Sequence, residues 1–426
     1  MSWETVPVEE EGIFFEAYRT TDELYNVRDT FFPLNPLDKF TKMRQLSSSA
    51  LTLLDSIPTE NRKLPMQRAT YEYLRGKILD ASPEYKKEAE EHLTKAVKLN
   101  PSLADAWLSL GNCIWKKGEL VTAMNCLKLA LKKGPHKKIL CLLSMLERKV
   151  SQDVESIEYV EESIKHAREA VSLDVKDGYS WYNLGNAFLT SFFMTLRLDL
   201  SPLLQAMKAY QNAERDERMQ SNPDLYFNSA TTHKYLENYE RALSGFEAAA
   251  LKDPGLGAAA EVERIVKLVD GVDRLLHVYA NSKRLASIAA SINTVQVNPS
   301  YRNFSIDTLQ EGDNRAVAII GKVLNRVLHE SATPEYYILC DPNQICYVLT
   351  VYGTVIDMGD DSKHILQDDQ VMVLDPHYRQ VDFSWKGKSY KFRSVRVDQV
   401  KQLLVNGMSL KLTRNAATPL RALHKP

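Results

Sequence analysis

The sequence predicts a mainly α-helical protein in which a solenoid of paired helices is followed by a C-terminal β-barrel. A helix–turn–helix signature recurs through most of the 426 residues and predicts the solenoid. Near Asn293 the apolar residues change from helical spacing to short alternating runs, which predict strands. Glycine, proline, asparagine and aspartate separate these runs, as they do between the strands of small barrels.

The composition is that of an ordinary folded protein with room for two or three domains. Apolar residues make up 44% and charged residues 26%, and the net charge is -1, so no overall field favours nucleic acid or a membrane surface. The five cysteines are odd in number and form no C-x-x-C pair, so we expect reduced thiols and a cytoplasmic and nuclear location. The N-terminus MSWETVPVEEEG lacks an apolar core, and no run of about 18 apolar residues occurs. We therefore expect neither a signal peptide nor a membrane-spanning segment.

The first part of the chain is predicted to be an N-terminal helical cap over residues 1–60. Leu24–Phe31 and Leu37–Ile57 have helical periodicity. A solenoid needs such a cap, because its terminal repeat otherwise exposes an apolar face. The repeat array is then expected over residues 61–292.

The clearest repeat runs from Ala104 to Pro135 and has the tetratricopeptide pattern, a helix pair of roughly 34 residues. Its signature residues are Trp107, Leu110, Gly111, Ile114, Ala123, Leu127 and Pro135. Gly111 and Ala123 are small, which predicts that the two helices cross closely there. Proline ends the unit because it cannot continue a helix.

The same pattern marks other units along the array. Gly76 to Pro101 is one unit, and Pro223 to Pro254 is another, with Ala230 where glycine is usual. The unit beginning near Trp181 has its second-helix alanine at Ala206 rather than at position 197, so we expect a longer loop, SFFMTLRLDLSP. Degenerate helix pairs are expected at Lys138–Val150 with Tyr159–Leu173, and at Ala258–Tyr279 with Lys283–Ile292.

The C-terminal part is predicted to be a linker over 293–304, a barrel of the OB type over 305–413 and a disordered tail over 414–426. The expected strands are Ala316–Val327, Tyr336–Leu339, Ile345–Tyr352, Val371–Leu374, Val381–Trp385 and Tyr390–Val397. Asp341–Gln344 would turn a hairpin between the second and third of them. Aromatic residues of the barrel could stack on bases, but at strand spacing we favour a core or a protein-docking face.

No catalytic constellation is present, so we expect an adaptor rather than an enzyme, and no cofactor. Gly387-Lys388-Ser389 resembles the end of a phosphate-binding loop, but the glycine required five residues earlier is absent. The nine histidines show no metal-ligand spacing. Cys340 and Cys346 face each other across the predicted hairpin and could oxidise, although two reduced thiols are the simpler interpretation.

A peptide groove is expected on the concave side, which the first helix of each unit lines. The repeat positions along those helices predict that one set of side chains faces inward: Asn112, Tyr179, Tyr182, Asn186, Asp224 and Phe227. Asparagine amides can pair with a peptide backbone, the aromatic rings can hold an apolar side chain, and the carboxylate can receive a cation. The alternative is that these are ordinary surface residues of a scaffold. Lys283 and Arg284 begin the last helix and are either solvated surface or a phosphate contact.

From Asp22 to Gly407 the chain resembles the tetratricopeptide repeat protein 5 (Strap) family. The resemblance is carried by DELYNVRDTFF, KKEAEEHLTKAVKLNP, DVKDGYSWYNLGNAF, SNPDLYFNSATTHKYLENYERALSGFEAAALKDP and GKSYKFRSVRVDQVKQLLVNG. It implies tubulin autoregulation: reading of the N-terminal peptide of nascent α- and β-tubulin at the ribosome, and recruitment of an adaptor for decay of the tubulin mRNA. The resemblance also implies an alternative role, a stress-responsive scaffold that links a histone acetyltransferase to an actin-nucleating coactivator. The predicted OB barrel suggests chromatin contact as an option within that alternative.

The resemblance also implies roles for particular residues. Arg148 and Asp224 align with a groove arginine and a groove acid, and Lys283 and Arg284 align with a cluster that contacts ribosomal RNA. A second groove acid of the family falls near Ala258 here, where Glu261 could substitute. The repeat leaves two orientations open for Arg148, one toward the groove and one toward the buried side.

Overall fold

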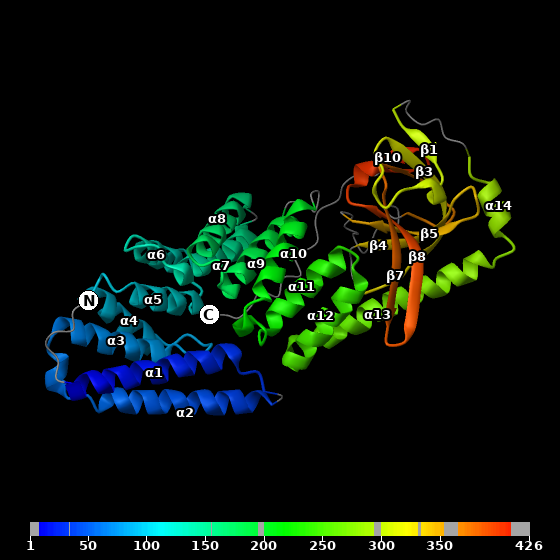
Figure 1. Cartoon of the computed structure of the whole chain (residues 1–426). Coiled ribbons are helices and arrows are strands. Elements are labelled where there is room, and N and C mark those ends of the chain that lie inside the picture. The colour runs from blue at the N-terminus through cyan, green and yellow to red at the C-terminus, as the bar shows by residue number, and fades with distance from the viewer. Residues whose placement is uncertain are drawn as a thin grey trace.

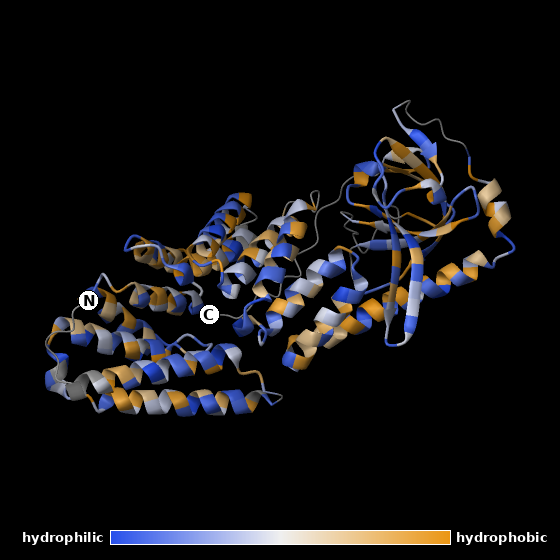
Figure 2. Cartoon of the chain, in the orientation of Figure 1, coloured by the Kyte–Doolittle hydropathy of each residue, from blue (hydrophilic) through white to orange (hydrophobic). Residues whose placement is uncertain are grey.

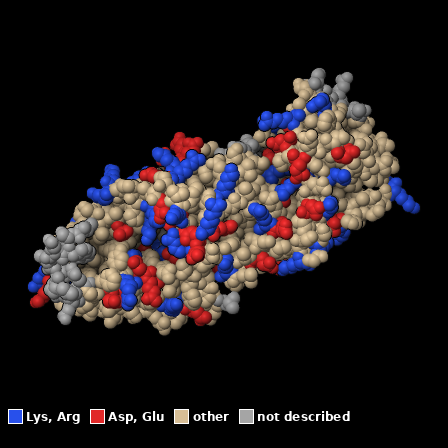
Figure 3. Space-filling model, viewed as in Figure 1, with Lys and Arg blue, Asp and Glu red and all other residues tan. Residues whose placement is uncertain are grey.

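A computed structural model of the chain describes residues 8–33, 35–154, 156–194, 200–293, 300–330, 334–352 and 365–409. A curved array of helices joins a β-barrel at its C-terminal end (Figure 1). Within the described segments, no helix has the combination of length and apolarity that a bilayer span requires. Basic and acidic side chains alternate over the visible face, without a large field of one sign (Figure 3).

The helices follow one another as stacked pairs through most of the chain. In chain order they are α1 (Val8–Thr30), α2 (Pro36–Asp55), α3 (Pro65–Leu79), α4 (Lys87–Leu99), α5 (Ala104–Lys116), α6 (Leu120–Leu131), α7 (Lys137–Val154), α8 (Ile157–Leu173), α9 (Gly178–Met194), α10 (Ser201–Ala213), α11 (Pro223–Tyr235), α12 (Tyr239–Lys252), α13 (Ala258–Ala280) and α14 (Leu285–Ala290). Each predicted repeat corresponds to one consecutive pair from α3–α4 to α11–α12. The mainly α-helical fold class is confirmed.

Close crossing explains the small residues of the repeats. A Cβ atom at Gly111 would lie 2.8 Å from Leu127 Cδ2, and one at Gly185 would lie 2.5 Å from Tyr210 Cε1. In the α11–α12 pair, where Ala230 replaces glycine, the second helix supplies Gly245 at the crossing, and a Cβ atom there would lie 2.9 Å from the Ala230 Cβ. The predicted close crossing is therefore confirmed. The glycine at the crossing can lie on either helix of a pair, and the two helices still pack closely.

Two predicted elements differ from the structure. Part of the expected long loop is helical, because α9 continues to Met194 and buries Phe192 and Phe193 against Tyr235. Residues 195–199 of that segment lie outside the described residues. The short helix α14 lies against strand β4 rather than pairing with α13, because α13 packs on the barrel instead.

The part of the barrel that the structure describes contains all six predicted strands and four that the sequence did not predict. They are β1 (Arg302–Phe304), β2 (Gly312–Asp313), β3 (Val317–Val327), β4 (Glu335–Cys340), β5 (Cys346–Val351), β6 (Gln370–Leu374), β7 (His377–Trp385), β8 (Lys388–Val397), β9 (Leu403–Val405) and β10 (Met408–Ser409). The main path through the sheet is β10-β9-β6-β3-β4-β5-β8-β7-β2, and β5 pairs with β8 in parallel. The β4–β5 hairpin is confirmed, with Cys340 opposite Cys346 and both thiols free.

The segment expected to be a linker contributes to the sheet. β1 lies within residues 293–304 and pairs in parallel with the start of β3. Three residues with one partner strand are too short to show the alternating pattern by which strands are recognised. The expected tail, residues 414–426, lies outside the described residues.

One face of the barrel packs on the last helices of the array. Phe383 and Phe392 lie against Tyr239 of α12, with ring centroids 5.9 and 6.5 Å apart, and Tyr390 stacks on Phe383. These rings share a buried cluster with Ile265 and Leu268 of α13, the helix whose apolar residues run beneath the barrel in Figure 2. Phe383, Tyr390 and Phe392, three of the aromatic side chains that could have stacked on bases, are thus a docking face for the protein's own helices.

Polar contacts fix the barrel to the C-terminal end of α11. Arg396 donates to the carbonyl of Tyr235, and Arg379 donates to the carbonyl of Leu236 and to Asn238 Oδ1. Both cations lie where the helix dipole is negative and the last carbonyl groups lack helical partners. The barrel therefore holds α11 at the end opposite to Asp224.

A candidate peptide groove around helix α9

The candidate site centres on Tyr182, which lies within electrostatic reach of one acidic and one basic side chain. Tyr182 is 8% exposed. Burial raises the pKa of its hydroxyl; the carboxylate of Asp224 raises this pKa further, and the guanidinium of Arg148 lowers it. Helices α7, α9 and α11 thus bring a cation, an aromatic ring and an anion together, although the three residues are far apart in the sequence.

Of the two orientations that the repeat left open, Arg148 takes the one toward the buried side of the array. Its guanidinium donates to Ser144 Oγ at 2.7 Å and to Asn183 Oδ1 at 2.9 Å, with Ser163 Oγ at 3.4 Å. All of these partners are uncharged, and among the described residues Arg148 forms no ion pair. Burial lowers the pKa of the guanidinium, yet an arginine stays protonated at neutral pH. A buried cation with only neutral partners is electrostatically incomplete.

Asp224 lies in the first turn of α11 and is 3% exposed. Asn222 caps this helix, because its side-chain oxygen accepts from the backbone N–H of Asp224 at 2.9 Å. A carboxylate in this position is stabilised by the positive end of the helix dipole. The predicted groove acid is therefore held at a helix start, close to Tyr182.

Tyr179 is the aromatic residue that remains accessible. It is 41% exposed, its hydroxyl donates to Met145 Sδ at 3.5 Å, and its ring lies 6.2 Å from that of Tyr182. Phe227 is different: it is 5% exposed and packs edge-on against Phe246 at 5.1 Å. The prediction that Phe227 lines the groove is corrected, because its ring fills the core between α11 and α12.

The two asparagines at the same repeat position have different environments. Asn186 is 2% exposed, and its carbonyl oxygen accepts from the Tyr210 hydroxyl at 2.8 Å and from Asn228 Nδ2 at 3.0 Å. Its carbonyl is thus engaged inside the core, contrary to the prediction that it holds a peptide backbone. The side-chain oxygen of Asn112 on α5 is buried and accepts no hydrogen bond from the described residues. Asn112 therefore retains an acceptor for a peptide N–H group.

Glu261 does not join Asp224. Its carboxylate pairs with Lys234 at 3.0 Å and with Arg264. Burial opposes its ionisation, but these two cations outweigh burial and leave the pKa of Glu261 below its ordinary value. Lys234 lies ten residues after Asp224 on α11, which corresponds to about 15 Å along the helix. Glu261 instead borders a pocket between α13 and the barrel, lined by Lys234, Arg264, Ile265, Lys267, Leu268, His329, Glu330, Pro334 and Tyr336.

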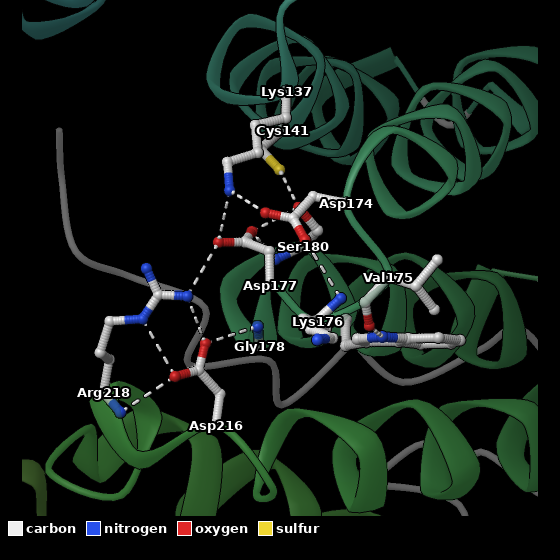
Figure 4. Close-up of polar contacts among 11 residues, drawn as sticks. Lys137, Cys141, Asp174, Val175, Lys176, Asp177, Gly178, Ser180, Asp216 and Arg218 are labelled. Atoms are coloured by element: carbon white, nitrogen blue, oxygen red, sulfur yellow. Dashed lines mark hydrogen bonds and ion pairs between the residues drawn. The ribbon is translucent and has the colours of Figure 1, made fainter.

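A charged cluster that the sequence analysis missed fixes the start of α9 (Figure 4). Asp177 accepts from the backbone N–H of Ser180 at 2.9 Å and pairs with Lys137 of α7 at 3.0 Å. Asp216 accepts from the backbone N–H of Gly178 at 2.8 Å and pairs with Arg218 at 2.7 Å. The Arg218 hydrogen bond lowers the pKa of Asp216 to about 2. An aspartate just before the helix, in DVKDG, was the available signal, since aspartate is a favoured helix cap.

Lys283 and Arg284 lie apart from the groove. Both are exposed in the turn between α13 and α14, with Arg284 at the N-cap of α14, and neither forms an ion pair among the described residues. Figure 1 shows this turn at the far end of α13. Helix α13 has 23 residues. At about 1.5 Å per residue, the basic pair is more than about 30 Å from the start of this helix.

The described residues contain no group of three or more histidine, cysteine, aspartate or glutamate side chains arranged to hold a metal ion. The residues that converge on Tyr182 offer hydrogen bonds, charge and apolar surface. This arrangement is suited to holding a peptide that carries both signs of charge.

Nearly the whole chain is similar to known proteins. Residues 300–418 match a family model described as the tetratricopeptide repeat protein 5 OB fold domain. The chain is 35% identical over 410 residues to "Tetratricopeptide repeat protein 5" of Homo sapiens and 34% identical to that of Mus musculus, with 91% of each chain covered.

Solved structures of repeat proteins also match. One is "YrrB: a TPR protein with an unusual peptide-binding site", with 18% identity, a TM-score of 0.36, and coverage of 49% of this chain and 97% of that one. Another is the "APC/C hetero-tetramer Cut9-Hcn1", with 15% identity, a TM-score of 0.40, and coverage of 61% of this chain and 51% of that one.

Proposed function

Because this chain belongs to the tetratricopeptide repeat protein 5 family, a family of protein-binding adaptors, we propose that it reads the N-terminal peptide of nascent α- and β-tubulin. Reading takes place at the ribosome in the cytoplasm, and it triggers decay of the tubulin mRNA during translation. The adaptor that recruits the decay machinery binds elsewhere on the protein. Family membership supports this proposal, and the charges around Tyr182 give it a physical basis.

One observation carries the proposal: Arg148 and Asp224 present opposite charges to the same ring. A nascent tubulin chain begins Met-Arg-Glu, so it offers two cationic groups followed by an anionic one. Asp224 receives a cationic group, and the glutamate provides the carboxylate that Arg148 lacks among the described residues. Each charge-assisted hydrogen bond contributes roughly 1.5–3 kcal/mol, and a peptide without the matching charge leaves a buried partner unsatisfied.

The remaining groove residues orient the peptide. Asn112 has a free acceptor for a backbone N–H, and the exposed ring of Tyr179 offers apolar surface to a side chain such as methionine. Lys283 and Arg284 contact ribosomal RNA from the far end of α13. Attachment through these cations is sensitive to salt, because phosphate contacts release counterions.

The test is binding of a synthetic peptide that begins Met-Arg-Glu, measured by calorimetry. Asp224→Asn removes the charge and keeps the shape, so we expect an affinity loss of at least about tenfold, equivalent to about 1.4 kcal/mol. Glu240→Gln is the control, because Glu240 is an exposed carboxylate in the first turn of the next helix, α12, and we expect its affinity to stay within about twofold of the wild type. Equal affinity of the wild type and Asp224→Asn would contradict the assignment of Asp224.

The coactivator-scaffold alternative gains no specific support from the barrel. The rings of Phe383, Tyr390 and Phe392 are packed on α12 and α13, so they are not available to stack on bases. We therefore do not extend the proposal to chromatin contact through this face.

A further inference from the structure

The tip of the α1–α2 hairpin, residues Arg28 to Lys39, faces the candidate groove from the opposite side. The ammonium of Lys39 lies within electrostatic reach of Asp29 on its own hairpin and also of Asp224 and Asp253. Tyr179 in turn lies within reach of Arg28 and Asp29. Figure 1 shows the same arrangement, with the end of α1 and the start of α2 turned toward the region where α11, α12 and α13 meet. Successive helix pairs each add a rotation, so the array curls and returns to itself.

The charges at this tip are held by their neighbours rather than carried on loose chains. The Arg28 guanidinium stacks 4.2 Å from the centre of the Tyr25 ring, and its Nε lies 2.7 Å from Asp29 Oδ1. The Lys39 ammonium lies 4.2 Å from the centre of the Phe32 ring. The Asp29 side chain is 56% exposed, so its carboxylate has a free side for another cation. Side chains fixed in this way lose little conformational entropy when a ligand binds.

The groove residues described above include no acid for the second cationic group of the peptide. A peptide with a free amino group and an arginine has two cationic groups, and Asp224 can hold one of them. Glu261 cannot hold the other, because it is already paired with Arg264 and with Lys234, which lies about 15 Å from Asp224 along α11. The α1–α2 tip carries an exposed carboxylate, that of Asp29, within electrostatic reach of Tyr179.

We infer that the α1–α2 tip is the second wall of the peptide groove and that Asp29 binds one of the two cationic groups of the peptide. This inference rests on the proposed function, which it extends with a residue that determines specificity. Arg28 keeps the Asp29 carboxylate in place. Lys39 repels a third cation, so a peptide with one more basic residue at this point is disfavoured.

The test is a double-mutant cycle between protein and peptide in the full-length chain. The probes are a peptide beginning Met-Arg-Glu, the same peptide with an acetylated N-terminus, and the same peptide with glutamine in place of arginine. We expect Asp29→Asn to weaken binding of the unmodified peptide by about tenfold. One of the two modified peptides lacks the cation that Asp29 binds. For that peptide, we expect Asp29→Asn to change the affinity by less than about twofold.

Glu23→Gln is the matched control, because Glu23 is an exposed carboxylate on the same helix, about 120° around from Asp29. We expect it to bind all three peptides like the wild type. Circular dichroism of each variant reports whether the helices are intact. Independently of any substitution, a photoreactive benzophenone at the fifth peptide residue should crosslink to residues 25–42 of the wild-type protein.

The outcomes separate the inference from the proposed function. If the wild type does not bind the peptide, the proposed function fails and the inference fails with it. If the wild type binds, but Asp29→Asn binds equally well, or crosslinks occur only outside residues 25–42, the inference alone is overturned. Tenfold weakening that disappears for one modified peptide supports both.

Discussion

At the scale of single residues, burial decides which predicted groove side chains can act. Arg148 and Asp224 are both nearly inaccessible, yet both act electrostatically on Tyr182, where a bound peptide would meet both charges. Phe227 and Asn186 are equally buried, but each already has its partner inside the protein. The useful distinction is therefore between charged side chains near Tyr182 and side chains engaged in core contacts, rather than between exposed and buried ones.

Asp216 should stabilise the start of α9 in a pH-dependent way. The pKa of its carboxyl group is about 2 in the folded protein, against an ordinary value of 3.8. Because the folded pKa is the lower one, its contribution is present above about pH 4 and is lost as the pH falls toward 2. We expect Asp216→Asn to lower the free energy of unfolding by about 1–2 kcal/mol at pH 7, because solvent around the exposed Arg218 screens part of the interaction.

The measurement is the difference in denaturation midpoint between the wild type and Asp216→Asn at a series of pH values. The difference should shrink as the pH falls below about 4. Glu217→Gln changes the neighbouring exposed carboxylate and should leave the midpoint nearly unchanged at every pH. A difference that stays constant from pH 7 to pH 3 would mean that the charge of Asp216 is not responsible.

At the scale of elements, helices α11 and α13 each separate residues that have different roles. Helix α11 has Asp224 at its start and the barrel arginines Arg379 and Arg396 at its C-terminal end. Helix α13 separates the groove from the exposed pair Lys283 and Arg284. Binding of peptide and binding of RNA should therefore be separable by substitution.

Reversing both charges, Lys283→Glu with Arg284→Glu, should release the protein from ribosomes and spare peptide binding. The reason is that the new carboxylates repel phosphate, while the pair lies apart from the groove, more than about 30 Å from the start of α13. Sedimentation with ribosomes at several salt concentrations, together with calorimetry on the peptide, measures the two activities. Lys132→Glu with Lys133→Glu, another exposed basic pair, is the control. Continued sedimentation of the Lys283/Arg284 variant would exclude this pair as the attachment point.

At the scale of the whole molecule, the barrel and the helical array form a continuous body. The apolar cluster that contains Phe246 and Val269 of the array also contains Val348 and Phe392 of the barrel. Burying this face removes the usual reason to regard the barrel as an independent binding module. It also explains why the aromatic residues of the barrel outnumber those that its own core uses.

The isolated barrel, residues 300–409, should therefore self-associate more than a fragment that includes its supporting helices. Exposing Phe383, Tyr390 and Phe392 creates an apolar patch, and such patches cause association. We expect the isolated barrel to bind a hydrophobic dye and to self-associate in size-exclusion chromatography, whereas residues 222–409 should remain monomeric. A monomeric isolated barrel without dye binding would show that the docking face is dispensable.

Much of the fold could be predicted from the sequence because its repeats are local. Trp107, Gly111 and Ala123 specify a helix pair through contacts within about 34 residues, and a proline closes it. The six longer strands were likewise recognisable from alternation and turn residues. The short strands β1, β2, β9 and β10 were not, since two or three residues carry no readable period.

The site was less predictable, because it depends on how successive pairs are turned toward each other. The sequence by itself determined the repeats, the barrel and the presence of Asp224 at an inward-facing position. Only the tertiary structure decided that Arg148 points inward to neutral partners, that Glu261 belongs to Lys234, and that the α1–α2 tip faces Tyr179. The physical reason is that repeat patterns encode contacts between neighbouring helices, whereas burial and charge pairing depend on segments that meet only after the whole array has curled.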